Sequence, residues 1–255
     1  GHPATTIITS RGCPFDCTFC ANKEVYGRAV RFHSAQRVYE EVKGLIDTYG
    51  VRQFRFHDDT MSINKRRLKD LSALLSPLNI RWRCNGRVDT ADIETLTLLK
   101  EAGCDEVGYG VETASQVALD LCGKRVTVEQ AERAIENTRK VGMKVRVFLV
   151  IGLPGDFGDM SGRIISFLER TRPDGANVST LTPFPGCEIH RNPEKFGMKL
   201  RNHDFSKYRM IRGLDDGEYE EDFPFEYEQM SNAELKVQRK AILEYVRDHH
   251  QDLNR

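Results

Sequence analysis

A loop near the start of the chain reads Cys13-Pro14-Phe15-Asp16-Cys17-Thr18-Phe19-Cys20, with its cysteines at spacings of four and three residues. It follows an apolar run, residues 4–9, that is typical of a β-strand. A loop can bring three such thiolates around one metal centre, and thiolates are favoured ligands of iron–sulfur clusters and of zinc. The other four cysteines are isolated in the sequence, so the loop itself provides only three cysteine ligands. Two alternatives follow: a cluster with one iron open to a small molecule, or a zinc knuckle completed by a distant Cys or His.

Length and charge set the first limits on function. The chain has 255 residues, enough for one large domain or two small ones, and its 38 basic residues balance its 38 acidic residues. The composition therefore gives no clear indication of nucleic-acid binding, which a net positive charge would favour. No apolar run approaches the ~20 residues of a membrane span, and no secretory signal is evident. Seven cysteines, an odd number, do not resemble a disulfide framework, so a reducing, cytoplasmic setting is expected.

Beyond the loop, short apolar runs alternate with stretches whose apolar residues recur at helical spacing. Six strand–helix units of this kind indicate a parallel sheet, because each helix crosses over to the next strand. We predict an α/β fold, a partial (β/α)6 TIM-like barrel with a C-terminal helical extension. The sequence leaves an open doubly wound sheet as the alternative. The expected strands cover residues 4–9, 51–57, 80–84, 106–111, 144–151 and 176–181.

Polar or turn-forming residues follow every expected strand. In barrels, the loops after the carboxyl ends of the strands build the site. Turn chemistry explains any single cluster, but six in register behind a cysteine triad favour one shared site. The clusters are the cysteine loop, Asp58 with Asp59, Arg87 with Asp89, Glu112, Pro154 with Gly155, and Pro183.

The pattern CxxxCxxC, with Phe19 just before the last cysteine, resembles the signature of the radical S-adenosylmethionine (SAM) superfamily. The resemblance implies a [4Fe-4S] cluster held by Cys13, Cys17 and Cys20, with SAM on the fourth iron. It also implies reductive cleavage of SAM to a 5′-deoxyadenosyl radical that abstracts hydrogen from a substrate. Methylation, cyclisation, rearrangement and oxidation all stay open as outcomes, and the substrate is unidentified. An electron donor such as flavodoxin or ferredoxin would be the partner.

The resemblance extends from about residue 5 to about residue 189 and points to the branch that often carries a cobalamin-binding domain. The segments that carry it are residues 87–89, 99–104, 110–115, 152–155 and 182–186. No Asp-x-His-x-x-Gly stretch of a cobalamin domain is present. Cobalamin would therefore sit on a domain absent from this chain, or the protein works without it.

Carried over position by position, the resemblance implies a set of SAM contacts. Phe19 would set its backbone against the adenine. Asp58 and Asp59 stand where many members have a Gly-Gly-Glu stretch that contacts the SAM amino group, although that glycine pair is missing here. Glu112 matches the position that contacts the ribose or methionyl part, and Lys124 or Arg125 would pair with the SAM carboxylate. The remaining cofactor residues are Arg87, Gly152, Pro154, Gly155, Thr182 and Pro183.

Cys187 follows Pro185-Gly186 where relatives commonly have threonine. It would be a hydrogen-atom donor or an unusual ligand, or else an incidental loop thiol. Two rival interpretations apply to the whole chain. One is a non-catalytic interaction module stabilised by zinc or an iron–sulfur cluster. The other is an α/β nucleotide-binding enzyme whose thiols are incidental.

We expect two parts: a barrel over residues 1–189 and a C-terminal extension over residues 190–255. The extension contains an acidic run, residues 215–222, that reads as a solvated loop able to cover the open side of the barrel. Its final helix, residues 231–249, begins with a capping box of Ser231 and Glu234. The apolar face of this helix is expected to dock on the barrel.

Overall fold

The computed structural model describes residues 3–201 and 223–250. Its main element is a six-stranded sheet with the strand order β1-β4-β5-β6-β7-β8. β1 pairs with β4, β4 with β5, and β5 with β6, each in parallel orientation. The strands of this sheet are β1 (Ala4–Ile7), β4 (Gln53–Phe56), β5 (Arg81–Gly86), β6 (Cys104–Glu112), β7 (Lys144–Ile151) and β8 (Gly175–Thr180).

Helices connect the successive strands, as a parallel sheet requires. Ser34 begins the first of them by accepting a hydrogen bond from the Arg37 amide, and Gly50 ends it with a φ of 67°. Asn64 caps the next helix in the same way. These strands and helices confirm the predicted β/α units, with small differences at their ends. The connecting helices are α2 (Ala35–Tyr49), α3 (Lys65–Leu75), α4 (Ile93–Glu101), α5 (Gln116–Leu121), α6 (Val128–Lys140) and α7 (Met160–Thr171).

The chain divides into two compact units. The first comprises Gly1–Pro14, Tyr26–Gly110 and Glu129–Arg146. The second comprises Phe15–Val25, Val111–Val128 and Val147–Arg255. Both units take segments that are far apart in the sequence. The predicted boundary between residues 189 and 190 stays a prediction.

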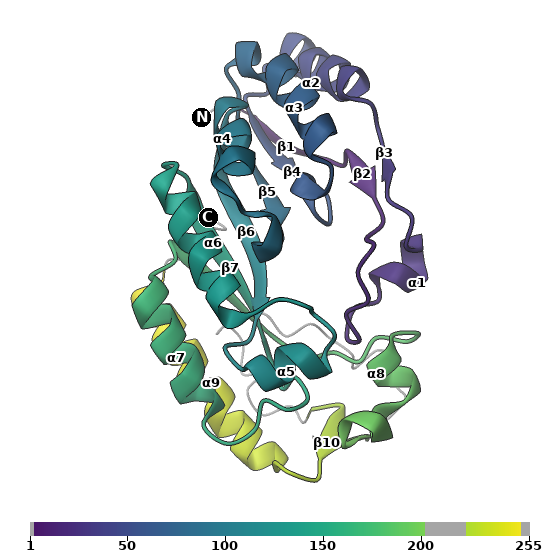
Figure 1. Cartoon of the computed structure of the whole chain (residues 1–255), viewed down its shortest axis with the longest axis vertical. Coiled ribbons are helices and arrows are strands. Elements are labelled where there is room, and N and C mark those ends of the chain that lie inside the picture. The colour runs from purple at the N-terminus through teal and green to yellow at the C-terminus, as the bar shows by residue number, and fades with distance from the viewer. Residues whose placement is uncertain (1–2, 202–222, 251–255) are drawn as a thin grey trace. The chain divides into compact units, whose positions relative to one another are not determined.

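In the first unit, α2, α3 and α4 lie side by side (Figure 1). The core of this unit contains Phe56 stacked on Trp82, with ring centroids 4.5 Å apart. The Trp82 indole N–H donates to the carbonyl of Ala102 at 2.6 Å, so the buried ring leaves no polar atom unsatisfied. Gly103 follows with a φ of +91°, and a side chain there would collide with the carbonyl of Ile80. The start of β6 therefore requires glycine.

In the second unit, α9 (Asn232–His249) packs along α7 (Figure 1). It begins with the predicted capping box: the Ser231 hydroxyl accepts from the Glu234 amide, and the Glu234 carboxylate accepts from the Ser231 amide. Its apolar stripe buries Leu235, Ile242 and Leu243. These contacts confirm the C-terminal helical extension.

Two small antiparallel sheets were not predicted. β2 (Ser10–Arg11) pairs with β3 (Arg31–Phe32), and β9 (Met198–Leu200) pairs with β10 (Phe225–Tyr227). Strands of two or three residues are too short to show a period in the sequence. The other short elements are α1 (Asn22–Tyr26), α8 (Glu188–Arg191) and the 3₁₀ turns η1 (Met61–Ile63), η2 (Ser76–Leu78), η3 (Val88–Thr90) and η4 (Pro193–Phe196).

The acidic run at residues 215–222 lies outside the described residues, and its predicted place over the barrel stays a prediction. Within residues 3–201 and 223–250, no helix is both long enough and apolar enough to cross a membrane.

Candidate active site

Cys13 stands at the end of a stretch of the first unit that is held by its backbone. Arg11 of β2 lies opposite Arg31 of β3. Gly12 follows with a φ of +100°, and a Cβ at this position would stand 2.5 Å from the carbonyl oxygen of Ala29. Both facts demand glycine. The chain therefore reaches Cys13 along a fixed path.

Cys17 and Cys20 belong to the second unit, where Thr18 between them is anchored by its backbone. The Thr18 amide donates to the carbonyl of Cys122, just after α5, at 2.9 Å. The Thr18 carbonyl accepts from the Ile189 amide of α8 at 3.1 Å. The Cys20 amide donates to the carbonyl of Cys17 at 3.1 Å, which closes a turn. This pair of thiols thus lies on a turn tied to two helices.

The cysteines of the chain fall into two groups by exposure, and all are free thiols. The Cys20 sulfur accepts from the Asn22 amide at 3.4 Å. Among the described residues, no three His, Cys, Asp or Glu side chains already surround a metal position, so convergence of the thiols stays a prediction. Reachable soft donors nevertheless fit a [4Fe-4S] cluster. The half-buried cysteines are Cys13, Cys17 and Cys20, and the buried ones are Cys84, Cys104, Cys122 and Cys187.

The two acids that follow β4 differ in their surroundings. Asp58 is 1% exposed, and its carboxylate accepts three hydrogen bonds of 2.6 Å, two from Thr9 and one from Ser10. Asp59, the next residue, is exposed. The SAM contact predicted for both stays a prediction, but only Asp59 presents its carboxylate to solvent.

Arg87 is buried immediately after β5, and Asp89 holds it in place. Its Nε and Nη2 atoms donate to the two carboxylate oxygens of Asp89 at 3.0 and 3.1 Å. This is the two-point geometry that gives Arg–carboxylate pairs their directional strength. The predicted cofactor residue is therefore oriented by its neighbour, and its contact with SAM stays a prediction.

Glu112 ends β6 in an unusual backbone conformation. Its φ of +68° lies in the left-handed region, which costs a residue with a Cβ of order 1 kcal/mol. Its carboxylate lies 2.5 Å from the ammonium of Lys124, and the two residues are only 8% and 7% exposed. Arg125 is exposed. Of the two basic residues offered by the sequence, Lys124 is the one directed toward Glu112.

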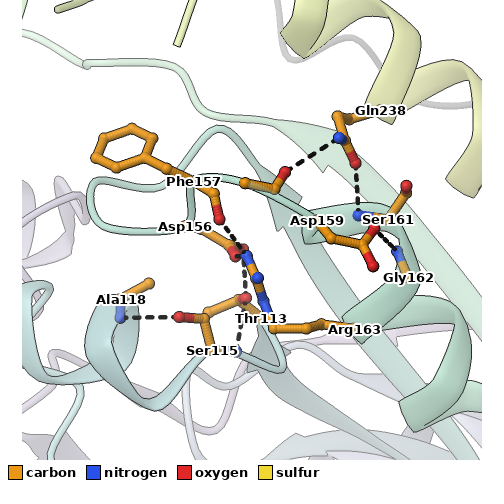
Figure 2. Close-up of polar contacts among 11 residues, drawn as sticks. Thr113, Ser115, Ala118, Asp156, Phe157, Asp159, Ser161, Gly162, Arg163 and Gln238 are labelled. Atoms are coloured by element: carbon orange, nitrogen blue, oxygen red, sulfur yellow. Dashed lines mark hydrogen bonds and ion pairs between the residues drawn. The ribbon is translucent and has the colours of Figure 1, made fainter. Parts of the chain in front are cut away.

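Asp156, which sequence reasoning did not single out, lies at the centre of a polar network in the second unit (Figure 2). Thr113 donates to one of its oxygens at 2.5 Å, and Arg163 donates to the other at 2.7 Å. The network links the loop after β6 to the loop after β7 and to α7. An Asp in a Gly- and Pro-rich turn is common, so no local sequence pattern distinguishes Asp156 from an ordinary turn residue.

The turn after β7 requires glycine at both ends. Gly152 and Gly155 have φ values of +86° and +80°. A Cβ on Gly155 would stand 2.5 Å from a Leu121 methyl of α5, and one on Gly152 would stand 3.1 Å from the Phe225 ring. The Tyr227 hydroxyl donates to the carbonyl of Gly152 at 2.9 Å. The C-terminal extension therefore packs on this turn, next to the buried Pro154.

The remaining predicted residues lie in the second unit. Thr182 and Pro183 are buried just after β8, and Phe19 is half-buried. Their contacts with SAM stay predictions. Cys187 is fully buried, and burial raises the pKa of its thiol, so it stays protonated at neutral pH. Its role as a hydrogen-atom donor or ligand also stays a prediction.

The strand order defines the class of scaffold, a β/α protein, and three half-buried thiols lie in the segment that follows its first strand. The family model described as "Radical SAM superfamily" matches residues 7–168. The chain belongs to the radical SAM superfamily, a family of enzymes.

Relatives and solved structures agree with this placement. The chain is 35% identical over 191 residues to an uncharacterised methyltransferase of Pyrococcus horikoshii, covering 74% of this chain and 42% of the relative. It is 28% identical over 246 residues to the anaerobic magnesium-protoporphyrin IX monomethyl ester cyclase of Rubrivivax gelatinosus, covering 92% of this chain and 42% of the relative. The chain thus spans less than half the length of both relatives.

Two solved structures share the fold. The radical SAM methyltransferase TsrM from Kitasatospora setae, with cobalamin and a [4Fe-4S] cluster bound, gives a TM-score of 0.70 at 19% identity and covers 80% of this chain and 43% of TsrM. The cobalamin-dependent radical SAM enzyme OxsB gives 0.58 at 20% identity and covers 76% of this chain and 30% of OxsB. Together with the strand order, these likenesses confirm the predicted partial (β/α)6 barrel.

Proposed function

We propose that this chain is the catalytic barrel of a radical SAM enzyme in which Cys13, Cys17 and Cys20 hold a [4Fe-4S] cluster. When bound and reduced, the cluster supplies the electron that cleaves SAM to a 5′-deoxyadenosyl radical, which abstracts hydrogen from the substrate. The observation that carries the proposal is the exposure of the thiols. Only the three cysteines with the family spacing are reachable, whereas the other four are buried.

The chain's own residues would bind and orient SAM. Lys124 and Glu112 offer a cation and an anion 2.5 Å apart, which matches the opposite charges on the SAM carboxylate and amino groups. Asp59, exposed after β4, would contact the amino group. Because Glu112 and Lys124 are largely buried, their charges act in a poorly solvated setting, where they interact more strongly than in water.

For the reaction that follows, we propose methyl transfer to an unidentified substrate, with cobalamin on a domain outside this chain. The Pyrococcus relative and TsrM are both described as methyltransferases, and TsrM and OxsB bind cobalamin. A cyclisation is the second candidate, because the Rubrivivax relative is a cyclase. Rearrangement and oxidation remain further outcomes of the same initial hydrogen abstraction.

We also propose that a small redox protein such as flavodoxin or ferredoxin delivers the electron. The seven cysteines are free thiols, which supports a reducing, cytoplasmic setting.

The test is low-temperature electron paramagnetic resonance (EPR) of anaerobically reconstituted, dithionite-reduced protein, with and without SAM, alongside metal analysis. We expect about four irons per chain, a cluster signal that shifts when SAM is added, and 5′-deoxyadenosine among the products. Zinc in place of iron, or a signal unmoved by SAM, would overturn the proposal in favour of a metal-stabilised interaction module. Normal activity after replacement of all three cysteines would favour the nucleotide-binding alternative.

A further inference from the structure

The Asp58 carboxylate is fully engaged with the chain segment that leads to Cys13. One of its oxygens accepts from the Thr9 amide, and the other accepts from the hydroxyls of Thr9 and Ser10, all at 2.6 Å. The residue is 1% exposed. Hydrogen bonds to a charged, buried acceptor are about twice as strong as neutral ones. A carboxylate that follows β4 therefore holds the beginning of the cysteine loop.

Arg67 of α3 holds the same segment from its carbonyl side. Its guanidinium donates to the carbonyl of Thr9 at 3.1 Å and to the carbonyl of His33 at 2.9 Å. The His33 amide in turn donates to the carbonyl of Thr9 at 2.9 Å. The guanidinium also lies 5.2 Å from the ring centroid of Phe32. One buried side chain thus fastens both strands of the β2–β3 ribbon, at the same end, to α3.

The four residues before Cys13 are consequently fixed one after another. Thr9 and Ser10 are held by Asp58, with Thr9 also bound by Arg67; Arg11 is held by its pairing with Arg31. Gly12 lies so close to the carbonyl of Ala29 that a side chain would not fit there. The restraint is thus continuous from Thr9 to Gly12, and Thr9 and Ser10 are buried. It is the kind of support that a metal ligand needs to keep its sulfur in place.

We propose that Asp58 and Arg67 are positioning residues that set the location of the Cys13 thiolate, and through it the stability and electronic properties of the cluster. The inference rests on the proposed function, because it needs a cluster to position. It assigns different roles to the two acidic residues that follow β4. Asp58 is committed to the loop, which leaves Asp59 to contact SAM.

The test compares Asp58→Ala and Asp58→Asn in the full chain, with Asp105→Asn as a matched loss of charge in the first unit. Asp105 pairs with the exposed Arg81 side chain at the start of its strand, so its loss should leave cluster loading unchanged. The readouts are iron content after reconstitution, the EPR spectrum and midpoint potential of the reduced cluster without SAM, and the spectral shift with SAM.

Asp58→Ala should lower the apparent affinity for iron about tenfold, as expected when a residue that orients a metal ligand is lost. The residual cluster should show an altered spectrum and potential before SAM is added. Asp58→Asn should recover much of the iron affinity and of the wild-type spectrum and potential, because an amide can keep the contacts with Thr9 and Ser10. In each variant, the loaded fraction should still respond to SAM.

A different pattern would overturn the inference. If both Asp58 variants load iron with the wild-type spectrum and potential but lose the response to SAM, Asp58 is a SAM ligand. Ser10→Ala removes a single hydrogen bond and should fold even if Asp58→Ala does not. An unchanged spectrum and potential in Ser10→Ala would also reject the inference. Failure of the proposed function is distinct, because the wild-type protein itself would then carry no SAM-responsive cluster.

Discussion

The ammonium nitrogen of Lys124 lies 2.5 Å from a carboxylate oxygen of Glu112, although the two residues are 12 positions apart and both are almost entirely buried. Removing two charges from water costs several kcal/mol per ion, and the attraction between them only partly offsets that cost. Glu112 additionally adopts a left-handed backbone. Such a pair fits the contact with SAM that we propose for these two residues.

Lys124→Met should lower the free energy of unfolding by about 3–5 kcal/mol, because it leaves the Glu112 charge buried without a partner. Adding Glu112→Gln should restore most of that loss. Urea unfolding of the metal-free protein measures both, with Arg125→Met as the exposed control, whose effect should be within about 0.5 kcal/mol. A double variant as unstable as Lys124→Met alone would show that the two side chains are not coupled.

Replacing any one of Cys13, Cys17 or Cys20 with Ala should remove most of the iron bound after reconstitution, since two thiolates cannot hold a four-iron cluster. Cys104→Ala is the matched control, because that thiol is buried in β6 and should not reach a metal. Its iron content should equal that of the wild type, despite some loss of stability from the cavity. Iron retained by a Cys17→Ala variant would contradict the ligand assignment.

Helices and strands with a regular apolar pattern and clear terminating residues were predictable from the sequence. β7 runs over Lys144–Ile151, as predicted, because its apolar run is bounded by Gly142 and Gly152. The cap at Ser34 and the capping box at Ser231 also follow from local residues alone. Local hydrogen bonding determines such features, so no knowledge of tertiary contacts is needed.

Apart from the cysteine motif and the basic residues at 124 and 125, the site was predictable as a set of strand ends. The pairing of Asp156 with Thr113 joins residues 43 positions apart, and no local sequence pattern predicts it. The same is true of Asp58, whose contacts with Thr9 and Ser10 span the whole first β/α unit. The sequence identifies which residues follow the strands, but which carboxylate is already engaged depends on tertiary folding.

Gly152→Ala should destabilise the protein for two separable reasons. The φ of +86° disfavours any Cβ, and the new methyl would stand 3.1 Å from the Phe225 ring. Gly158→Ala isolates the first reason, because Gly158 has a φ of +73° and nothing within 4 Å of a Cβ. We expect a loss of about 1 kcal/mol at Gly158 and about 2–3 kcal/mol at Gly152.

Urea unfolding checks the comparison, and Phe225→Leu offers a second test of the contact. In that background, Gly152→Ala should cost little more than Gly158→Ala, because the ring no longer meets the new methyl. Equal losses at the two glycines in the wild-type background would show that Phe225 does not hold the turn.

Tyr109 makes stability depend on pH in the alkaline range. Its hydroxyl is buried against Thr138 at 2.8 Å, and burial raises its pKa well above the ordinary value of 10.0. Above pH 10 the unfolded chain therefore loses a proton that the folded protein keeps, so the free energy of unfolding falls as the pH rises. The ionisation of Tyr109 has no effect on the free energy of unfolding below pH 10. Above pH 10 it lowers that free energy by about 1.4 kcal/mol per pH unit.

Tyr109→Phe should accordingly be less stable than the wild type at pH 8 by about 1 kcal/mol, the worth of the lost hydrogen bond to Thr138. Near pH 11 the two proteins should become about equally stable, because only the wild type has to hold a phenol neutral. Urea unfolding at both pH values under reducing conditions tests this, and the other buried groups cancel in the comparison. A difference that is the same at pH 8 and pH 11 would mean that Tyr109 ionises in the folded protein as readily as in water.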